Sequence, residues 1–304
     1  MATGVHFDQK FLQRGALVPT PKLAMWLFMV TEIMFFTGLI GTHSLLRMGT
    51  PEGHWPAPRQ VHLKEWMGAV NTFVLIASSF TIVLAHSAIA RGDTKRCLLL
   101  VGITLFGGVL FLGIKAVEYT AKFQHHIMPG RIGDNLDPDG RTPYDPNVAL
   151  AYRDEVRGQL EAIVKDPAKH GISEGSEDFK TAQAFLEDIK GTAEKAPISP
   201  LEVGLRLHPP EDKEKYEAYE QKYGNLHLTP YIPYGNLWAS TYFTMTGFHA
   251  AHVIGGLVLF VIILMKGFRG NLLPRHAMML ELTGLYWHFV DVVWIFLFPI
   301  LYLV

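Results

Sequence analysis

Five stretches of the chain are apolar on every side and long enough to cross a membrane. A membrane-spanning helix needs about 20 predominantly apolar residues, far more than a buried strand contains. Because apolar and polar residues do not alternate at every second position, the pattern predicts helices rather than strands. The predicted helices cover residues 23–46, 66–90, 97–121, 237–265 and 281–304.

The longest polar segment, 122–235, separates the third predicted helix from the fourth. Its first part, 128–147, is rich in Gly, Pro and Asp, which is typical of a loop. Beyond it, apolar residues recur at helical spacing and predict helices at 147–165, 176–195 and 211–222. The expected apolar face of the first of these helices comprises Leu150, Val156, Leu160 and Ile163.

The sequence therefore predicts an all-α membrane protein in three parts. Residues 1–121 would hold an N-terminal tail and three transmembrane helices, 122–235 an extramembrane, partly helical insert, and 236–304 the last two helices. We expect the insert to form a small helical cap on the outer ends of the membrane helices. Acidic residues outnumber basic ones in the insert, so the alternative interpretation is a docking surface for a basic partner such as a cytochrome c.

Lys and Arg are distributed unequally between the two sides of the predicted membrane domain. Short cytoplasmic loops usually carry the excess of these residues. The tail and the loops after helices two and four carry nine: Lys10, Arg14, Lys22, Arg91, Lys95, Arg96, Lys266, Arg269 and Arg275. The loop after helix one carries only Arg47, Arg59 and Lys64. We therefore expect a bacterial inner-membrane protein with a cytoplasmic N-terminus and with the insert and the C-terminus in the periplasm.

Charge and cysteine content exclude several classes of protein. The net charge is −1 and no basic patch stands out, so nothing indicates a nucleic-acid partner. Cys97 is the only cysteine, so the chain cannot form an intramolecular disulfide or build a thiolate metal cluster alone. We expect the chain itself to bind no metal or redox cofactor.

Glu32 lies near the middle of the first predicted helix, in an apolar neighbourhood without Lys or Arg within one turn. A carboxyl group inside a membrane is costly, by about 2.5–3.5 kcal/mol on insertion scales. Two interpretations remain open. Glu32 either faces a cleft and contacts protons or lipids, or it is a neutral acid hydrogen-bonded to a neighbouring helix.

Three pairs of polar residues lie three positions apart on predicted membrane helices. Each pair can therefore share one helix face. Lys115 and Glu118 predict a structural ion pair. The small residues around His249 and His252 predict close helix packing rather than metal or haem ligation, because no further ligands accompany them.

The third pair, His288 and Asp291, lies on the last predicted helix. A carboxylate can fix the tautomer and orientation of an imidazole. We expect a mutually satisfied pair that anchors helix packing, with a proton relay as the alternative.

These residues belong to segments that resemble subunit III of the cytochrome c oxidases, in the haem-copper oxidase subunit III family. Residues 286–294, YWHFVDVVW, resemble the signature of that family's last helix, and 246–256, TGFHAAHVIGG, resemble the helix before it. Residues 31–36, TEIMFF, resemble the segment that holds the family's membrane-embedded glutamate. The family's Glu-Tyr pair and its acidic residue before the last helix correspond here to Glu118, Tyr119 and Glu281.

The resemblance implies a non-redox accessory subunit of a proton-pumping oxidase that reduces oxygen with electrons from cytochrome c. The chain would pack against subunit I beside subunit II, and haem and copper would lie in those partners. Its helices would form two bundles around a cleft that holds phospholipid, with Glu32 facing the cleft and supporting proton uptake. A structural polar network would comprise His249, His252, Glu281, His288 and Asp291.

The chain departs from the family pattern in having five rather than seven membrane helices and an unusually long insert. It also lacks the spaced histidines of a subunit I and the paired cysteines of a subunit II. Quinol oxidases and nitric oxide reductases with an accessory subunit of the same family stay as alternatives for the complex. Two other classes stay open: a stand-alone ion or proton transporter, and a cytochrome that binds haem through His249 and His252.

Overall fold

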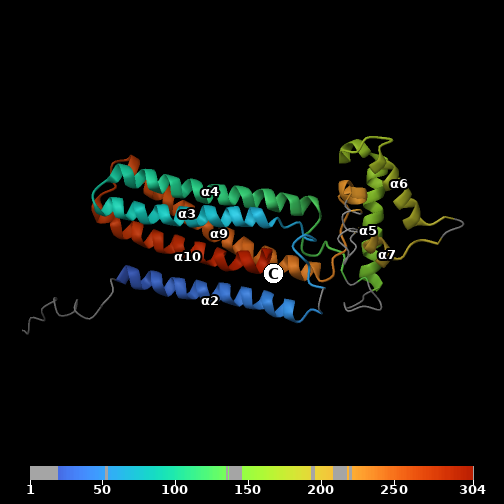
Figure 1. The fold of residues 1–304 in the computed structure, drawn as a ribbon, viewed down its shortest axis with the longest axis horizontal. Helices are drawn as coiled ribbons and strands as arrows, with labels where there is room; N and C mark the ends of the chain where they lie inside the picture. Colours follow the sequence, from blue (N-terminus) through green and yellow to red (C-terminus); the bar gives the residue numbers. More distant parts are fainter. Residues whose placement is uncertain are drawn as a thin grey trace, which may run out of the picture. The chain divides into compact units, whose positions relative to one another are not determined.

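Five long helices account for the parts of the chain that the sequence predicts to cross a membrane. The computed structural model describes residues 20–51, 54–134, 136, 146–192, 196–207, 218 and 221–303. Within these residues the helices long and apolar enough to span a membrane are α2 (Thr20–Met48), α3 (Glu65–Ala90), α4 (Thr94–Gln124), α9 (Gly235–Phe268) and α10 (Ala277–Tyr302) (Figure 1). The prediction of five membrane helices is confirmed, and the chain is a multi-pass membrane protein.

The predicted helix ends differ from the observed ones by a few residues. The largest difference is at α10, which begins at Ala277 because the 3-10 turn Pro274–His276 leads directly into it. Lys10 and Arg14, which contributed to the predicted orientation, lie outside the described residues.

The chain forms two compact units, and the long helices contribute residues to both. Unit 1 comprises Met1–Leu39, Val70–Leu112 and Phe248–Phe296. Unit 2 comprises Ile40–Ala69, Gly113–Gly247 and Leu297–Val304, and therefore includes the insert.

Trp287 is the centre of the packing in unit 1. Its side chain is fully buried, and its indole Nε1 donates a hydrogen bond to Ser78 Oγ of α3 at 3.0 Å. A Cβ atom at Gly108 of α4 would lie 2.7 Å from the indole, and one at Gly256 of α9 would lie 2.6 Å from it. The absence of side chains at these glycines therefore lets α4 and α9 approach α10 closely.

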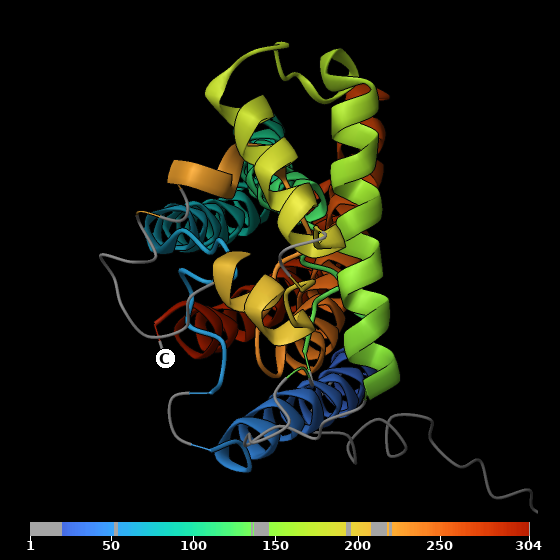
Figure 2. The ribbon, with the colours of Figure 1, turned by 90° about the vertical axis from the view of Figure 1, so that its right-hand side faces the viewer.

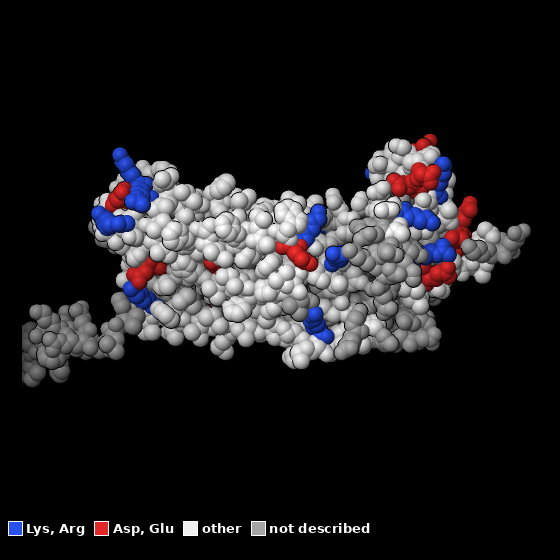
Figure 3. Space-filling model, in the orientation of Figure 1, with Lys and Arg blue, Asp and Glu red and all other residues white. Residues whose placement is uncertain are grey.

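Large apolar side chains cover the outer faces of the long helices. For example, Leu27 of α2 is 61% exposed and Met34 is 70% exposed. Soluble proteins rarely expose apolar surfaces as extensive as this one. On the face shown in Figure 3, charged side chains gather at the ends of the long helices and on the insert, and the surface along the helices between them carries almost no charged groups. This distribution is the one expected of helices surrounded by lipid or by other membrane subunits.

The insert has its own helices and its own hydrophobic core. Helices α6 (Glu177–Lys190) and α7 (Pro200–Leu207) pack against α5 (Pro146–Lys165) (Figure 2). The 3-10 turn Pro167–His170 lies between α5 and α6, and a second 3-10 turn, Gly224–Leu226, contacts α6 near the end of the insert. The core is formed by side chains of these elements and their connections, among them Tyr152, Val156, Leu160, Ile163, Ala182, Phe185, Ile189 and Val203.

The predictions for the insert were right for two helices and incomplete elsewhere. The helix expected at 176–195 ends at Lys190, because Gly191 terminates it and donates its N–H to Glu187 O. Helix α7 was not predicted. Most of the helix expected at 211–222, and part of the loop expected at 128–147, lie outside the described residues.

The predicted apolar face of the first insert helix was wrong at one position. Leu150 is 45% exposed, whereas Ala149 and Tyr152 are buried in the core. Helix α5 is therefore rotated so that Ala149, rather than Leu150, shares a face with Tyr152 and Val156.

The two ends of the insert are joined by backbone hydrogen bonds. Gly133 N donates to Pro230 O at 2.9 Å, and Ile232 N donates to Gly133 O at 2.8 Å. They form an isolated parallel bridge between Gly133 and Tyr231. The chain thus leaves and re-enters the membrane-helix part of unit 2 at neighbouring points.

Candidate functional site

Glu32 of α2 and His252 of α9 form a polar pair inside unit 1. His252 Nε2 lies 3.1 Å from Glu32 Oε2. Both side chains are largely buried, with 17% of His252 and 21% of Glu32 exposed. The structure thus gives Glu32 a hydrogen-bond partner on a neighbouring helix, and part of its surface stays accessible.

The hydrogen bonds of His252 define how many protons the pair holds. His252 Nδ1 lies 2.8 Å from the carbonyl oxygen of Phe248, which can only accept, so Nδ1 carries a hydrogen. The contact between Nε2 and the carboxyl group then requires one further proton, which resides either on Glu32 or on Nε2. Both arrangements are electrically neutral overall. The pair can therefore move a proton between its members without creating a net buried charge.

Aromatic rings surround this pair. The ring centroid of His252 lies 5.3 Å from that of Phe36 and 6.3 Å from that of Phe289. The hydroxyl group of Tyr286 donates to the backbone carbonyl oxygen of His252 at 2.8 Å. These contacts fix the position of the imidazole and limit the access of water from the sides that they cover.

Two further predicted network residues of unit 1 have clear contacts. Glu281 Oε1 lies 2.5 Å from Lys22 Nζ, which joins α10 to the start of α2. His249 is buried, and its ring lies 5.5 Å from the ring of Phe111 and 5.1 Å from that of Trp294. His249 and His252 therefore have separate surroundings rather than a shared ligand position.

The expected pair of His288 and Asp291 is not observed. No hydrogen bond or ion pair joins the two side chains in the described part of the chain, and Asp291 Oδ1 is buried without a hydrogen-bond partner there. Spacing of three residues places two side chains on one helix face but does not require them to meet. The expectation that the two residues satisfy each other was wrong.

Unit 2 contains a second buried polar cluster, built around Lys115 and Glu118 of α4. Lys115 Nζ donates to Glu118 Oε1 at 2.8 Å, to Tyr302 Oη at 2.9 Å and to Tyr242 Oη at 3.1 Å. These bonds use all three hydrogens of the ammonium group. Glu118 in turn accepts from Tyr242 at Oε1 and from Tyr302 at Oε2, the latter at 2.6 Å. The two charges thus have a complete set of partners although both are buried.

Lys122 lies one helical turn beyond Glu118 and is also fully buried. Its Nζ donates to the backbone carbonyl oxygen of Val61 at 2.7 Å. It also lies 4.8 Å from the ring centroid of Tyr242 and 5.2 Å from that of Trp238, within the range of cation–π attraction. Lys122 therefore connects the α2–α3 loop to α4 and α9 in unit 2.

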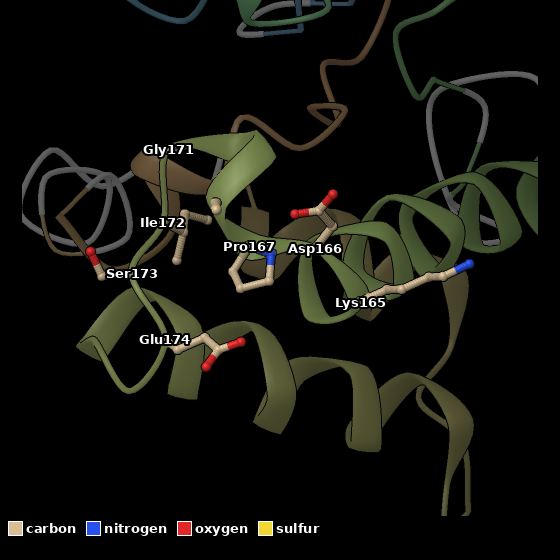
Figure 4. A pocket seen from close by; sticks show the side chains of 8 residues that line it. Lys165, Asp166, Pro167, Gly171, Ile172, Ser173 and Glu174 are labelled. Atoms are coloured by element: carbon tan, nitrogen blue, oxygen red, sulfur yellow. The ribbon is translucent and has the colours of Figure 1, made fainter.

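A hollow of about 370 Å³ lies in the insert between the end of α5 and the start of α6. It is lined by residues 165–168 and 171–174 (Figure 4). Its charged lining residues are of both signs, and the Lys165 side chain extends away from the other labelled side chains. This arrangement offers no converging set of groups, and we assign it no ligand.

Comparison with known proteins shows the relationship of the chain. The sequence model of the family "Cytochrome c oxidase subunit III" matches residues 10–130 and 223–304, which is most of the chain. The chain belongs to this family. The matched parts contain all five membrane helices and both polar clusters, whereas 131–222 of the insert is unmatched.

Relatives named cytochrome c oxidase subunit 3 include proteins of animals, plants and bacteria. The pig protein (Sus scrofa) is 24% identical over 287 residues, which is 92% of this chain and 68% of that protein. The protein of Corynebacterium diphtheriae is 42% identical over 69 residues, and that of Marchantia polymorpha is 41% identical over 73 residues. These two shorter matches cover 34% and 28% of the respective relatives.

Several groups in the clusters of this subunit III family member were not identified from the sequence. Tyr242 and Tyr302 lie on helices distant in sequence from Glu118, so helical spacing gives no signal for them. Lys122 was assigned to the insert, although its spacing of seven residues from Lys115 places both on one face of a continued helix. That spacing was the available signal.

Proposed function

We propose that this chain is the non-redox accessory subunit of a proton-pumping haem-copper oxidase. It would pack against subunit I beside subunit II, and those partners would carry the haem and copper. The observation that carries the proposal is the family match across all five membrane helices, including Glu32 and its partner His252. The single cysteine of the chain supports the view that it holds no copper-thiolate centre.

We further propose that the pair of Glu32 and His252 supports proton uptake beside bound phospholipid. Its geometry supports this role, because Glu32 and Nε2 of His252 share one proton, and the pair is neutral overall and partly accessible. A lipid headgroup near the pair would supply hydrogen-bonding groups and exclude bulk water. The chain would then help to maintain turnover without taking part in oxygen chemistry.

The proposed setting is a bacterial inner membrane with the N-terminus in the cytoplasm. The excess of Lys and Arg on the N-terminal side supports this orientation. The insert would then face the periplasm, where a cytochrome c could approach it. Turnover with cytochrome c should in that case weaken when the insert is removed and should depend on salt.

Purification of the tagged chain in a mild detergent tests the central proposal. Mass spectrometry should detect subunits I and II, and the absorption spectrum should contain haem bands. The haem type and the donor that the complex oxidises would separate a cytochrome c oxidase from a quinol oxidase or a nitric oxide reductase. A colourless chain that purifies alone in a stable form would contradict the proposal and favour a stand-alone transporter.

A further inference from the structure

Four histidines from three separate segments meet in unit 2. His62 lies in the α2–α3 loop, His125 and His126 directly follow α4, and His227 follows the 3-10 turn Gly224–Leu226 at the end of the insert. The rings of His62 and His125 are stacked, with centroids 4.0 Å apart and planes inclined by 12°. The ring of His227 meets that of His125 edge-on at 5.1 Å. His125 is therefore the central member of the group.

The backbone at three of these histidines supports a specific arrangement. His62, His126 and His227 have φ values of 51°, 54° and 49°, in the left-handed region that residues with a side chain seldom occupy. Such a conformation persists where surrounding contacts compensate for its cost. The ring contacts with His125 can compensate for this cost at His62 and His227.

The surroundings of the group are rich in positive charge. Lys122 and Arg131 lie on the α4 side, and Glu155 of α5 is the acidic group that faces His126. Burial, followed by the charges of His227, His126 and Lys122, lowers the pKa of His125 below its usual value of 6.5. Burial also lowers the pKa of His126, against the opposing effect of Glu155.

We propose that this histidine group is a pH-sensitive latch between the insert and the end of α4. While the imidazoles are neutral, their stacked and edge-on contacts hold the α2–α3 loop and the returning end of the insert to His125. When two or more of them bind protons, like charges meet at these short distances and the segments separate. A compartment that becomes acidic would thereby loosen this end of the insert.

The geometry favours proton binding over metal binding. Nitrogen lone pairs lie in the ring planes, and the nearly parallel planes of His62 and His125 do not direct them toward one point. Within the described ranges, no group of three or more His, Cys, Asp or Glu residues has the arrangement needed to hold a metal ion.

The direction of the pH effect follows from proton linkage. Since the closed contact lowers the pKa of His125 and His126, the open form binds protons first as the pH falls through about 6.5. The latch is therefore fully stable above that pH and weakens below it. Between pH 7.5 and 5.5 the opening equilibrium should rise about tenfold for each histidine whose protonation the closed contact prevents.

Amide hydrogen exchange of the full chain in lipid nanodiscs measures this opening. After correction for intrinsic rates, residues 221–234 of the wild-type chain should exchange up to about a hundredfold faster at pH 5.5 than at pH 7.5, about tenfold for each of His125 and His126. His125→Gln removes both ring contacts, so the same segment should exchange at pH 7.5 about as fast as the wild-type segment does at pH 5.5. His170→Gln changes an exposed histidine elsewhere in the insert and should behave like the wild type.

A wild-type segment that exchanges equally at both pH values would overturn the proposal, as would a His125→Gln chain that keeps the full pH step. If His125→Gln does not fold, titration of ¹³C-labelled histidines in the wild-type chain decides the question. The pKa values of His125 and His126 should then lie below the ordinary histidine value of 6.5. Independent titration of all of them at the ordinary histidine value would refute the latch.

Discussion

Replacement of Glu118 by glutamine would leave the ammonium group of Lys115 buried without its counter-charge. The side chains are only 7% exposed for Lys115 and 3% exposed for Glu118, so water cannot take over the role of the carboxylate. Removal of one partner from a buried ion pair costs about 3–5 kcal/mol. We expect Glu118→Gln to lower the free energy of unfolding by about that amount, because the amide retains the hydrogen bonds only in part.

Equilibrium unfolding of the chain in mixed detergent micelles measures this loss, and the chain offers a matched control. Glu177 and Lys180 have the same spacing and lie 3.5 Å apart, but their side chains are 91% and 64% exposed. Glu177→Gln should therefore have no measurable effect. Lys115→Met on the Glu118→Gln background should recover part of the loss, because no charge then stays buried.

The reasoning fails if Glu118→Gln costs no more than Glu177→Gln. That result would mean that Lys115 does not depend on Glu118 for its charged state. A double variant that loses as much as the sum of its single variants would also contradict the model of a coupled pair, since independent sites are additive.

Three more predictions concern the other parts of the chain. Glu32→Ala should leave the initial rate of oxygen reduction by the complex nearly unchanged and shorten its working lifetime in an oxygen electrode; immediate loss of turnover would show a catalytic role. Gly256→Ala should lower the free energy of unfolding by about 1–3 kcal/mol, because the added Cβ would lie 2.6 Å from Trp287. Gly247→Ala, on the same helix with nothing within 4 Å of the added atom, should be neutral or stabilising. Ser176→Ala should cost about 1 kcal/mol, because the Ser176 side chain accepts the N–H of Phe179 at the start of α6, and faster amide exchange there should reveal it.

Properties that depend on residues close in sequence could be predicted without the structure. The five membrane helices follow from the length and uniform apolar character of their segments, which tertiary contacts do not alter. The meeting of Lys115 with Glu118 depends only on helix geometry, and they are in fact in contact. In the insert, the spacing of apolar residues was sufficient to predict helix α5. It did not give the correct buried face, because Leu150 is exposed.

Contacts between distant segments could not be predicted in the same way. Glu32 meets His252 across 220 positions of sequence, and helical spacing does not say which helices become neighbours. The failure of His288 to pair with Asp291 has the same origin. Neighbouring helices determine the direction and partners of each side chain, so residues on one face need not bind each other.

The bridge between Gly133 and Tyr231 makes the insert a module whose length can vary. Because the two ends of the insert lie side by side, the distance between its attachment points on the remaining part of unit 2 does not depend on the number of residues in the insert. The family match stops at 130 and resumes at 223, close to these two positions. A lineage can therefore acquire, enlarge or discard such a module, and a fluorescent or affinity domain can be grafted in its place, without resetting the ends of α4 and α9.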